Sequence, residues 1–260
     1  MDIDLSFIPV ESREKSLQSI SKSIDHITEN LQYTIPGIRV ILRKATSSDL
    51  PFGFNVILNN VTVKVEINTV IRGSVFSPEN ASLCNKASSI LESDIEVKRL
   101  SVPDLYGGKI CAALDRQHPR DLFDVKLLLE NEGLTENIRK AFIVYLISHP
   151  RPMSELLCPN LKDIRPVFEN ELQGMTFEPV TLENLLDTRD KLIRRITADL
   201  TEKERNFILP VKTGRPEWKD LGIDGISQLA AVRWQLENLK QIDPGKRAAA
   251  IEKLKRCLQM

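Results

Sequence analysis

Three acidic residues are placed where they could hold a metal ion. Asp2 and Asp4 lie two positions apart in Met1-Asp2-Ile3-Asp4-Leu5, and Glu66 lies in Val-Lys-Val-Glu-Ile-Asn. On a strand, side chains at i and i+2 point to the same face with Cα atoms ~6.6 Å apart. Carboxylates so close repel unless a cation lies between them, and Mg²⁺ or Mn²⁺ prefers oxygen ligands. Beside the first strand, Glu66 would complete a three-carboxylate site for phosphoryl or nucleotidyl transfer.

Each of these acids also has a purely structural interpretation. Asp2 and Asp4 could be a solvated acidic terminus, which is the commoner meaning of an isolated Asp-x-Asp. Glu66 could be a solvent-facing strand residue, and the two interpretations of this position are about equally good.

A second group of charged residues follows Gly107-Gly108. Lys109 and Arg116 are seven positions apart, hence on one helical face, and the polar residues Arg120, Asp121 and Asp124 open the next helix. Two glycines inside a helix cost ~1 kcal/mol each, so we expect a close approach there. The cations could hold a triphosphate while an acid orients an attacking hydroxyl. The alternative is a network of surface ion pairs joining two helices, which residue type alone slightly favours.

Composition narrows the class of protein. The 260 residues have 42% hydrophobic and 28% charged side chains, as in an ordinary globular protein. The 36 Lys and Arg balance the 36 Asp and Glu, so binding to nucleic acid through net charge alone is not expected. With 5% aromatic residues, a stacking platform for single strands is disfavoured. The acidic start and the lack of a long apolar run predict a cytoplasmic protein without membrane spans.

The four cysteines, Cys84, Cys111, Cys158 and Cys257, form no CxxC pair and no cluster with histidine. We therefore expect reduced, buried thiols and no structural zinc.

Hydrophobic periodicity predicts the elements that position these residues. A strand over the first ten residues precedes a helix whose apolar residues recur every three or four positions from Leu17 to Leu31, and Pro36-Gly37 ends it. Strands are expected over 38–45, 52–58 and 61–70, with a tight turn at Asn59-Asn60. From Ser101 the period is helical, and helices are predicted over 101–116, 119–132, 135–148, 181–200, 201–209, 226–240 and 244–258. Ser101 with Asp104 resembles a capping box, and Asp243 is a good N-cap.

This order predicts an α/β (α+β) lobe with a mixed sheet over residues 1–100, and an all-helical lobe over 101–260 that contributes part of the active site.

The chain resembles the AbiEii family of nucleotidyltransferase toxins, from type IV toxin–antitoxin and phage-abortive systems. The resemblance spans nearly the whole chain, and its most specific part is Lys109 to Arg116 with Arg120-Asp121-Leu122-Phe123-Asp124. The other matching pieces are Asp2-Ile3-Asp4-Leu5, the strand that contains Glu66, Gly214 to Trp218, and Gln228 to Leu239. The last two pieces support homology rather than chemistry.

The resemblance implies a nucleotidyltransferase-like fold and a function for each matching residue. Asp2, Asp4 and Glu66 would be ligands of Mg²⁺ (or Mn²⁺), and Lys109 would contact phosphates. Asp121 would be a general base, and Arg116, Arg120 and Asp124 would support substrate binding. The implied reaction moves a nucleotide from an NTP to an RNA acceptor, with tRNA the leading candidate, and a DNA-binding antitoxin would be encoded nearby.

One departure from the family pattern motivates a second hypothesis. In the family, a Gly-Gly or Gly-Ser turn and a helix precede the aspartate strand, whereas this sequence starts at the aspartates. The chain is thus expected to bind NTP weakly and its metal site to be loose. The alternative function is that of a truncated, catalytically impaired member that acts as a binding module for an antitoxin or a nucleic acid. A metal-free structural domain, whose polar residues merely pair, is a third option.

Overall fold

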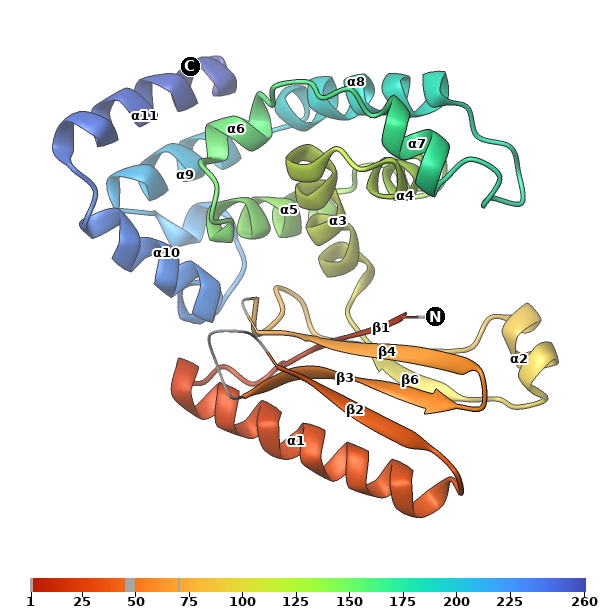
Figure 1. Ribbon diagram of the computed structural model, residues 1–260. Helices are drawn as coiled ribbons and strands as arrows, with labels where there is room; N and C mark the ends of the chain where they lie inside the picture. The colour runs from red at the N-terminus through yellow and green to blue at the C-terminus, as the bar shows by residue number, and fades with distance from the viewer. Residues whose placement is uncertain (1, 45–49, 70) are drawn as a thin grey trace. The chain divides into compact units, whose positions relative to one another are not determined.

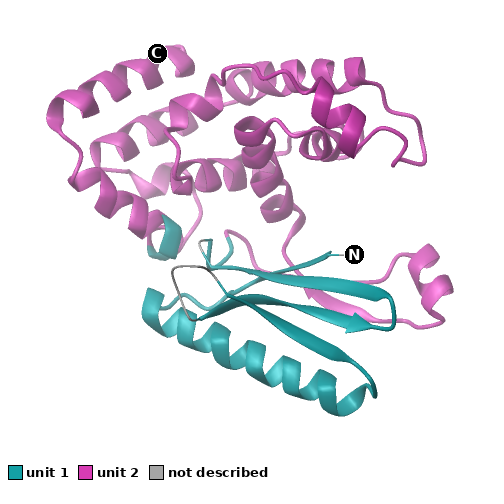
Figure 2. Cartoon of the chain, viewed as in Figure 1, with its two compact units in different colours: residues 1–74, 228–231 teal, residues 75–227, 232–260 magenta. Residues whose placement is uncertain are grey.

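The computed structural model describes residues 2–44, 50–69 and 71–260. The chain forms two compact units (Figure 2), one from residues 1–74 with 228–231 and the other from 75–227 with 232–260. The β5–α2–β6 segment described below thus groups with the helices. A domain boundary near residue 100 stays a prediction.

Unit 1 contains one four-stranded sheet and one long helix (Figure 1). Its elements are β1 (Asp2–Ser6), α1 (Arg13–Thr34), β2 (Arg39–Lys44), β3 (Pro51–Leu58) and β4 (Val61–Asn68). The strand order is β1-β4-β3-β2, with β1 parallel to β4 and the other pairs antiparallel. The predicted mixed sheet is thereby confirmed. The ends of two expected strands, Ala45 and Val70, lie outside the described residues.

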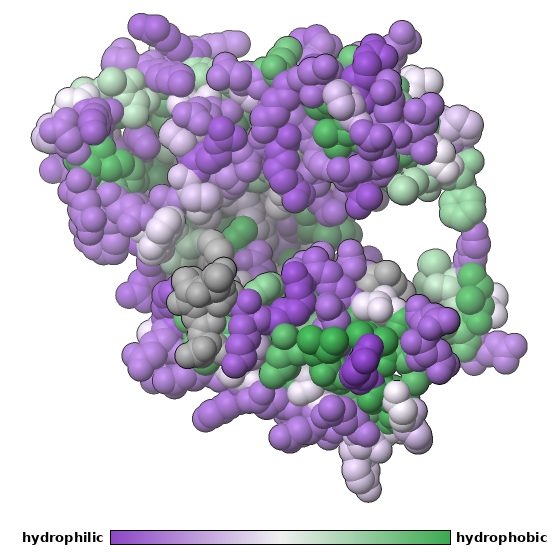
Figure 3. Space-filling model, viewed as in Figure 1, coloured by the Kyte–Doolittle hydropathy of each residue, from purple (hydrophilic) through white to green (hydrophobic). Residues whose placement is uncertain are grey.

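The core of unit 1 lies between α1 and one face of the sheet. Ile20 and Ile24 of α1 pack with Phe54 of β3 and Val65 of β4, and all four side chains are buried. Burying a side chain of this size contributes about 1.5–3 kcal/mol. Because strand side chains alternate, the apolar residues of β1 and β4 face α1 and their polar neighbours occupy the opposite face. Apolar surface also remains exposed over the strands of unit 1 (Figure 3), including Leu42, Leu58 and Val61.

Local signals set the ends of these elements, and the end of α1 and the Asn59 turn were predicted from the sequence. Ser12 caps α1 by accepting a hydrogen bond from the Lys15 amide, and the helix ends just before Pro36-Gly37. Asn59 adopts φ 52°, the left-handed conformation expected for the turn between β3 and β4.

Unit 2 begins with a small antiparallel sheet that the sequence did not predict, formed by β5 (Glu79–Ser82) and β6 (Glu96–Arg99) on either side of α2 (Asn85–Leu91). Every described element after β6 is helical. These are α3 (Val102–Arg116), α4 (Pro119–Glu130), α5 (Glu136–Ser148), α6 (Met153–Leu157), α7 (Arg165–Glu171), α8 (Leu182–Ala198), α9 (Glu202–Thr213), α10 (Ala230–Lys240) and α11 (Pro244–Leu258), with short 3₁₀ turns at Trp218–Asp220 and Ile226–Gln228. Of these, α6 and α7 were not predicted.

Two predictions about the helices after residue 200 need correction. The helix expected to end near Leu209 continues to Thr213 with Pro210 inside it, and its last turn closes where the Gly214 amide donates to the Pro210 carbonyl. The helix expected over 226–240 divides into a 3₁₀ turn and α10. The N-cap at Asp243 is confirmed, because its carboxylate accepts from the Lys246 amide at 3.0 Å.

Asp104 has a larger role than the capping box predicted for it. Ser101 accepts from the Asp104 amide as expected, but the buried Asp104 carboxylate does not return to the Ser101 amide. It accepts hydrogen bonds from the Ser101 and Tyr145 hydroxyls and from the Val75 and Phe76 amides, at 2.8–3.0 Å. Asp104 thus connects α3, α5 and the chain entering unit 2.

Within the described residues, no helix combines the length and the apolar character needed to cross a bilayer.

Candidate functional site

The three acids of the sequence hypothesis share one face of the sheet in unit 1. In the parallel pairing of β1 with β4, Asp2 lies opposite Lys64 and Asp4 lies opposite Glu66. Residues paired in this way point to the same side of a sheet. The intervening pair, Ile3 and Val65, points to the side that carries α1. The acids therefore lie on the face away from α1.

Glu66 is held by two cations in this structure. One carboxylate oxygen is 2.5 Å from Arg43 Nη1 and the other is 2.7 Å from Lys64 Nζ. The hydrogen bond from Lys64, with that from Arg43 and both positive charges, outweighs desolvation and lowers the pKa of Glu66 below its ordinary value. Glu66 is thus an ionised carboxylate whose two oxygens are both engaged.

Gly53 makes the Arg43–Glu66 contact possible. It lies between them in the register, opposite Glu66 on β4 and opposite Arg43 on β2. A Cβ at this position would lie 2.3 Å from the Val65 carbonyl oxygen, which no side chain tolerates. At Gly53, β3 therefore has no side chain between the two charged residues. The Arg43 side chain extends across β3 at this point and its guanidinium reaches Glu66.

The chemistry of the donor set fits a hard divalent cation in part. Asp2 and Asp4 are exposed, and their carboxylates have no hydrogen-bond or ion-pair partner among the described residues. Their oxygens are therefore free to bind a cation from the face away from α1. Over residues 2–44, 50–69 and 71–260, no three acidic, histidine or cysteine side chains are grouped closely enough to hold a metal. Glu66 would join such a site only by releasing Arg43 or Lys64.

The second group of charged residues lies at the junction of α3 and α4 in unit 2. Lys109 Nζ is 2.7 Å from an Asp124 carboxylate oxygen, and both side chains are partly exposed. Arg116 donates two hydrogen bonds to Asp121, of 3.0 and 2.7 Å. The Asp121 side chain is only 6% exposed, whereas that of Arg116 is 63% exposed. Such a two-point contact holds a carboxylate in one orientation.

Arg120 does not pair with Asp124, although the two lie within i, i+4 reach. Its guanidinium donates to the Glu171 backbone carbonyl and lies 3.9 Å from the Glu171 carboxylate. Arg120 therefore connects α4 to α7.

The close approach expected at Gly107-Gly108 is confirmed for Gly107 and not for Gly108. A Cβ on Gly107 would lie 2.9 Å from backbone atoms of Ala141 and Phe142, so α3 can pack against α5 only with glycine there. A Cβ on Gly108 would meet nothing within 4 Å. Packing among the described residues therefore does not explain why position 108, next to Lys109, is a glycine.

Sequence reasoning missed three residues of the sheet face: Arg43, Gly53 and Lys64. Lys64 could have been found, because it lies two positions before Glu66 on the same strand. Arg43 and Gly53 could not, because their relation to Glu66 depends on the register of three strands.

The cysteines are free thiols, as expected, and Cys111 and Cys257 are buried. The expected burial is wrong for Cys84 and Cys158, which are exposed. Burial is the main reason why the pKa of Cys257 is raised to about 12.

The chain belongs to the family of nucleotidyl transferase AbiEii toxins of type IV toxin–antitoxin systems, whose family model matches residues 1–238. Among solved structures, it is similar to MenT4, a nucleotidyltransferase toxin from Mycobacterium tuberculosis H37Rv. The TM-score is 0.53 at 14% identity, over 92% of this chain and 77% of that one, a likeness of fold alone. No curated protein matches.

Proposed function

We propose that this chain transfers a nucleotide from an NTP to an RNA acceptor, with tRNA the leading candidate, in a reaction that depends on Mg²⁺ or Mn²⁺. The observation that carries this proposal is the register of β1 and β4, which sets Asp4 beside Glu66 and leaves the Asp2 and Asp4 carboxylates free. Membership of a nucleotidyltransferase toxin family supports the reaction class.

Each residue has a function in the proposed reaction. Asp2 and Asp4 would hold the cation, and Glu66 would be a third acidic position once one of its cations moves. When bound, a divalent cation neutralises charge on the transferring phosphorus and activates the attacking oxygen. Lys109 would exchange Asp124 for a phosphate oxygen, which its partial exposure allows.

Asp121 is proposed to accept the proton of the attacking hydroxyl. Arg116 fixes the orientation of its carboxylate through two hydrogen bonds. Arg120 and Asp124 would support this arrangement, Arg120 by fixing α4 to α7 and Asp124 by positioning Lys109.

The biological setting proposed is a cytoplasmic toxin neutralised through an antitoxin, with a DNA-binding antitoxin encoded nearby. The type IV toxin–antitoxin family supports the existence of an antitoxin.

The proposal is tested by incubating the purified chain with each labelled NTP, Mg²⁺ and total tRNA. We expect label on RNA from wild type, and none from Asp4→Asn or Lys109→Gln. Asp25→Asn is the matched control, because Asp25 is an exposed acid of α1 in the same unit. Undiminished labelling by Asp4→Asn would overturn the proposal.

The ion pairs on Glu66 favour one alternative, a binding module without catalysis. With both oxygens engaged by Arg43 and Lys64, Glu66 contributes no free ligand in this conformation. Retained binding of RNA or antitoxin, with no transfer by the wild-type chain to any acceptor, would support this alternative.

A further inference from the structure

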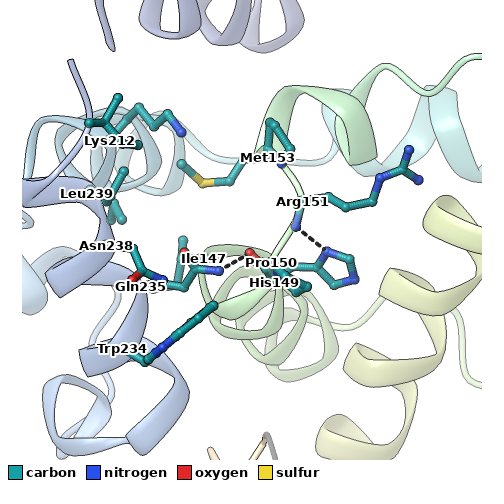
Figure 4. Close-up of a pocket in the computed structure, with 13 residues that line it drawn as sticks. Ile147, His149, Pro150, Arg151, Met153, Lys212, Trp234, Gln235, Asn238 and Leu239 are labelled. Carbon is teal, nitrogen blue, oxygen red and sulfur yellow. Dashed lines mark hydrogen bonds between the residues drawn. The ribbon is translucent and has the colours of Figure 1, made fainter. Parts of the chain in front are cut away.

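A cavity in unit 2 lies outside the residues assigned above. It is bounded by the 147–153 segment between α5 and α6, the last turn of α9 and the length of α10 (Figure 4). Its volume is about 230 Å³, below the ~300 Å³ at which drug-sized ligand sites usually begin. We refer to it as the α9–α10 pocket.

Seven of the thirteen residues that line the α9–α10 pocket are aliphatic, proline or methionine residues, and the other six carry cationic, imidazole, amide or indole groups; none is a carboxylate. Lys212 contributes an ammonium group that has no hydrogen-bond or ion-pair partner within the described ranges. Burial, and then the nearby positive charge of Arg247, lower the pKa of Lys212. A half-buried cation beside a second cation is stabilised when an anion binds to it.

Arg247 of α11 adds a second positive charge near Lys212. Its Nη2 donates to the Leu239 carbonyl, but its Nε is buried without a hydrogen-bond partner. Arg247 does not line the pocket and its Nε is buried, so it acts on the site only through its positive charge beside Lys212.

The other end of the pocket carries Trp234, whose side chain is 52% exposed although it is large and apolar. Asn238 lies one helical turn further along α10, on the same face, and its amide has no partner among the described residues. Figure 4 shows Trp234 and Lys212 at opposite ends of the pocket with Asn238 between them. The Gln235 amide is already used, because it donates to the His149 carbonyl.

We propose that the α9–α10 pocket binds one unpaired nucleotide of a single-stranded RNA segment, with the base on Trp234, its edge at Asn238 and its phosphate at Lys212. An aromatic face, a free amide and an unpaired cation in a row match the three parts of a nucleotide. An acidic peptide would satisfy Lys212 but would leave Trp234 and Asn238 without partners. The inference rests on the proposed function in taking the acceptor to be RNA.

This location also gives a chemical use to the segment from Gln228 to Leu239, which the sequence had linked only to homology. One tryptophan suits one nucleotide rather than a stacking platform, in agreement with the low aromatic content. The zero net charge of the chain does not oppose the site, because the cations are local to it.

The test measures RNA binding by the full chain without NTP or Mg²⁺, so it does not depend on transfer. In a Trp218→Phe background, tryptophan fluorescence reports Trp234 alone, and phenylalanine retains the packing of residue 218 on Phe207. Titration with a short single-stranded RNA should quench this fluorescence. In parallel, anisotropy of labelled RNA gives the affinity of variants with Trp218 intact.

We expect Trp234→Ala to weaken RNA binding about tenfold and Trp234→Phe to restore much of the loss. Lys212→Gln should reduce the slope of log affinity against log salt by about 0.7, the value for one phosphate contact on a single strand. Lys219→Gln is the matched control, because its side chain is 82% exposed and outside the pocket. Thermal melting of each variant separates loss of binding from loss of fold.

Unchanged RNA affinity in folded Trp234→Ala and Lys212→Gln would overturn the inference. Equal quenching by free nucleotides or by an acidic peptide would also overturn it, because the ligand would then not be RNA. If RNA binding behaves as expected while no acceptor is labelled, the pocket stands and the transferase proposal fails. If labelling is normal and the two variants leave the acceptor KM unchanged, the transferase stands and the pocket fails.

Discussion

Asp4 and Glu66 are direct partners in the register of two parallel strands, 62 positions apart in the sequence. Their side chains share the sheet face away from α1, yet Asp4 is without an ion-pair partner among the described residues while Glu66 is paired to Arg43 and Lys64. Two acids of one proposed site thus start from different states. Asp4 can bind a metal cation directly, whereas Glu66 must first release Arg43 or Lys64.

The two cations on Glu66 make part of the stability of unit 1 depend on pH. Because the folded pKa of Glu66 lies below its ordinary value of 4.5, the contribution is fully present above that value and is lost as pH falls through the folded pKa. Urea unfolding at about pH 6 and about pH 3 should therefore show a smaller gap between wild type and Glu66→Gln at the lower pH. A gap that does not change with pH would mean that the pairs contribute nothing.

Arg43→Gln should release one oxygen of Glu66 and tighten the binding of Mg²⁺, if Glu66 is a ligand. The measurement is the rise in melting temperature with added Mg²⁺, because a ligand that binds only the native state stabilises it. Arg39→Gln, on the same strand four positions away, is the matched control. No difference between the two variants would remove Glu66 from the proposed cation site.

Replacing the two glycines of α3 with alanine, one at a time, should change the stability of the protein in opposite directions. Gly107→Ala places a methyl group against the backbone of α5 and should destabilise the protein by about 1–3 kcal/mol. Gly108→Ala meets open space and should stabilise the helix by about 0.5–1 kcal/mol. Chemical denaturation of the pair tests this directly. Equal destabilisation by both would show that Gly108 is also closely packed.

Loss of the Asp104 carboxylate should be among the most damaging single changes in unit 2. Asp104→Ala leaves the Val75 and Phe76 amides and the Tyr145 hydroxyl without their acceptor, at a cost of about 3–5 kcal/mol. Tyr145→Phe removes the hydroxyl donor itself, so no donor is left without an acceptor, and it should cost about 1 kcal/mol. Asp94→Ala, at an exposed position, is the control in urea unfolding. A cost below 1 kcal/mol for Asp104→Ala would contradict this role.

The Arg116–Asp121 pair should be sensitive to geometry as well as to charge. Arg116→Lys keeps the positive charge but cannot reproduce the two parallel hydrogen bonds. We expect it to lower kcat and shift the pH profile of transfer, with Arg116→Ala more severe and Asp121→Asn inactive. A pH profile identical to that of wild type in Arg116→Lys would mean that Arg116 does not position the proposed base.

Much of the fold could be predicted because the apolar periodicity is strong and local. The 3–4 spacing from Leu17 to Leu31 gave α1, and the alternation around Glu66 gave β4 and the face on which Glu66 lies. The placement of the three acids on one face followed from strand parity. Their pairing as direct neighbours also required that β1 lie parallel to β4 in the register that sets Asp4 opposite Glu66.

What could not be predicted depends on register or on weak local signals. The Arg43–Glu66 pair needs β2, β3 and β4 in one specific alignment with glycine between the charges. Strands β5 and β6 have four residues each and are mostly exposed, so they carry no hydrophobic period. The assigned roles of Asp2, Asp4, Glu66, Lys109 and Asp121 stay predictions, because structure and family membership show placement and class but not chemistry.

Calorimetric titration of the chain with Mg²⁺ and each of the four NTPs tests the central claim most directly. The account predicts binding of at least one Mg²⁺–NTP pair by wild type and by Asp25→Asn, and loss of that binding in Asp4→Asn. Binding that persists undiminished in folded Asp4→Asn, or its absence in folded wild type, would contradict the claim that the aspartate strand forms a nucleotidyltransferase site.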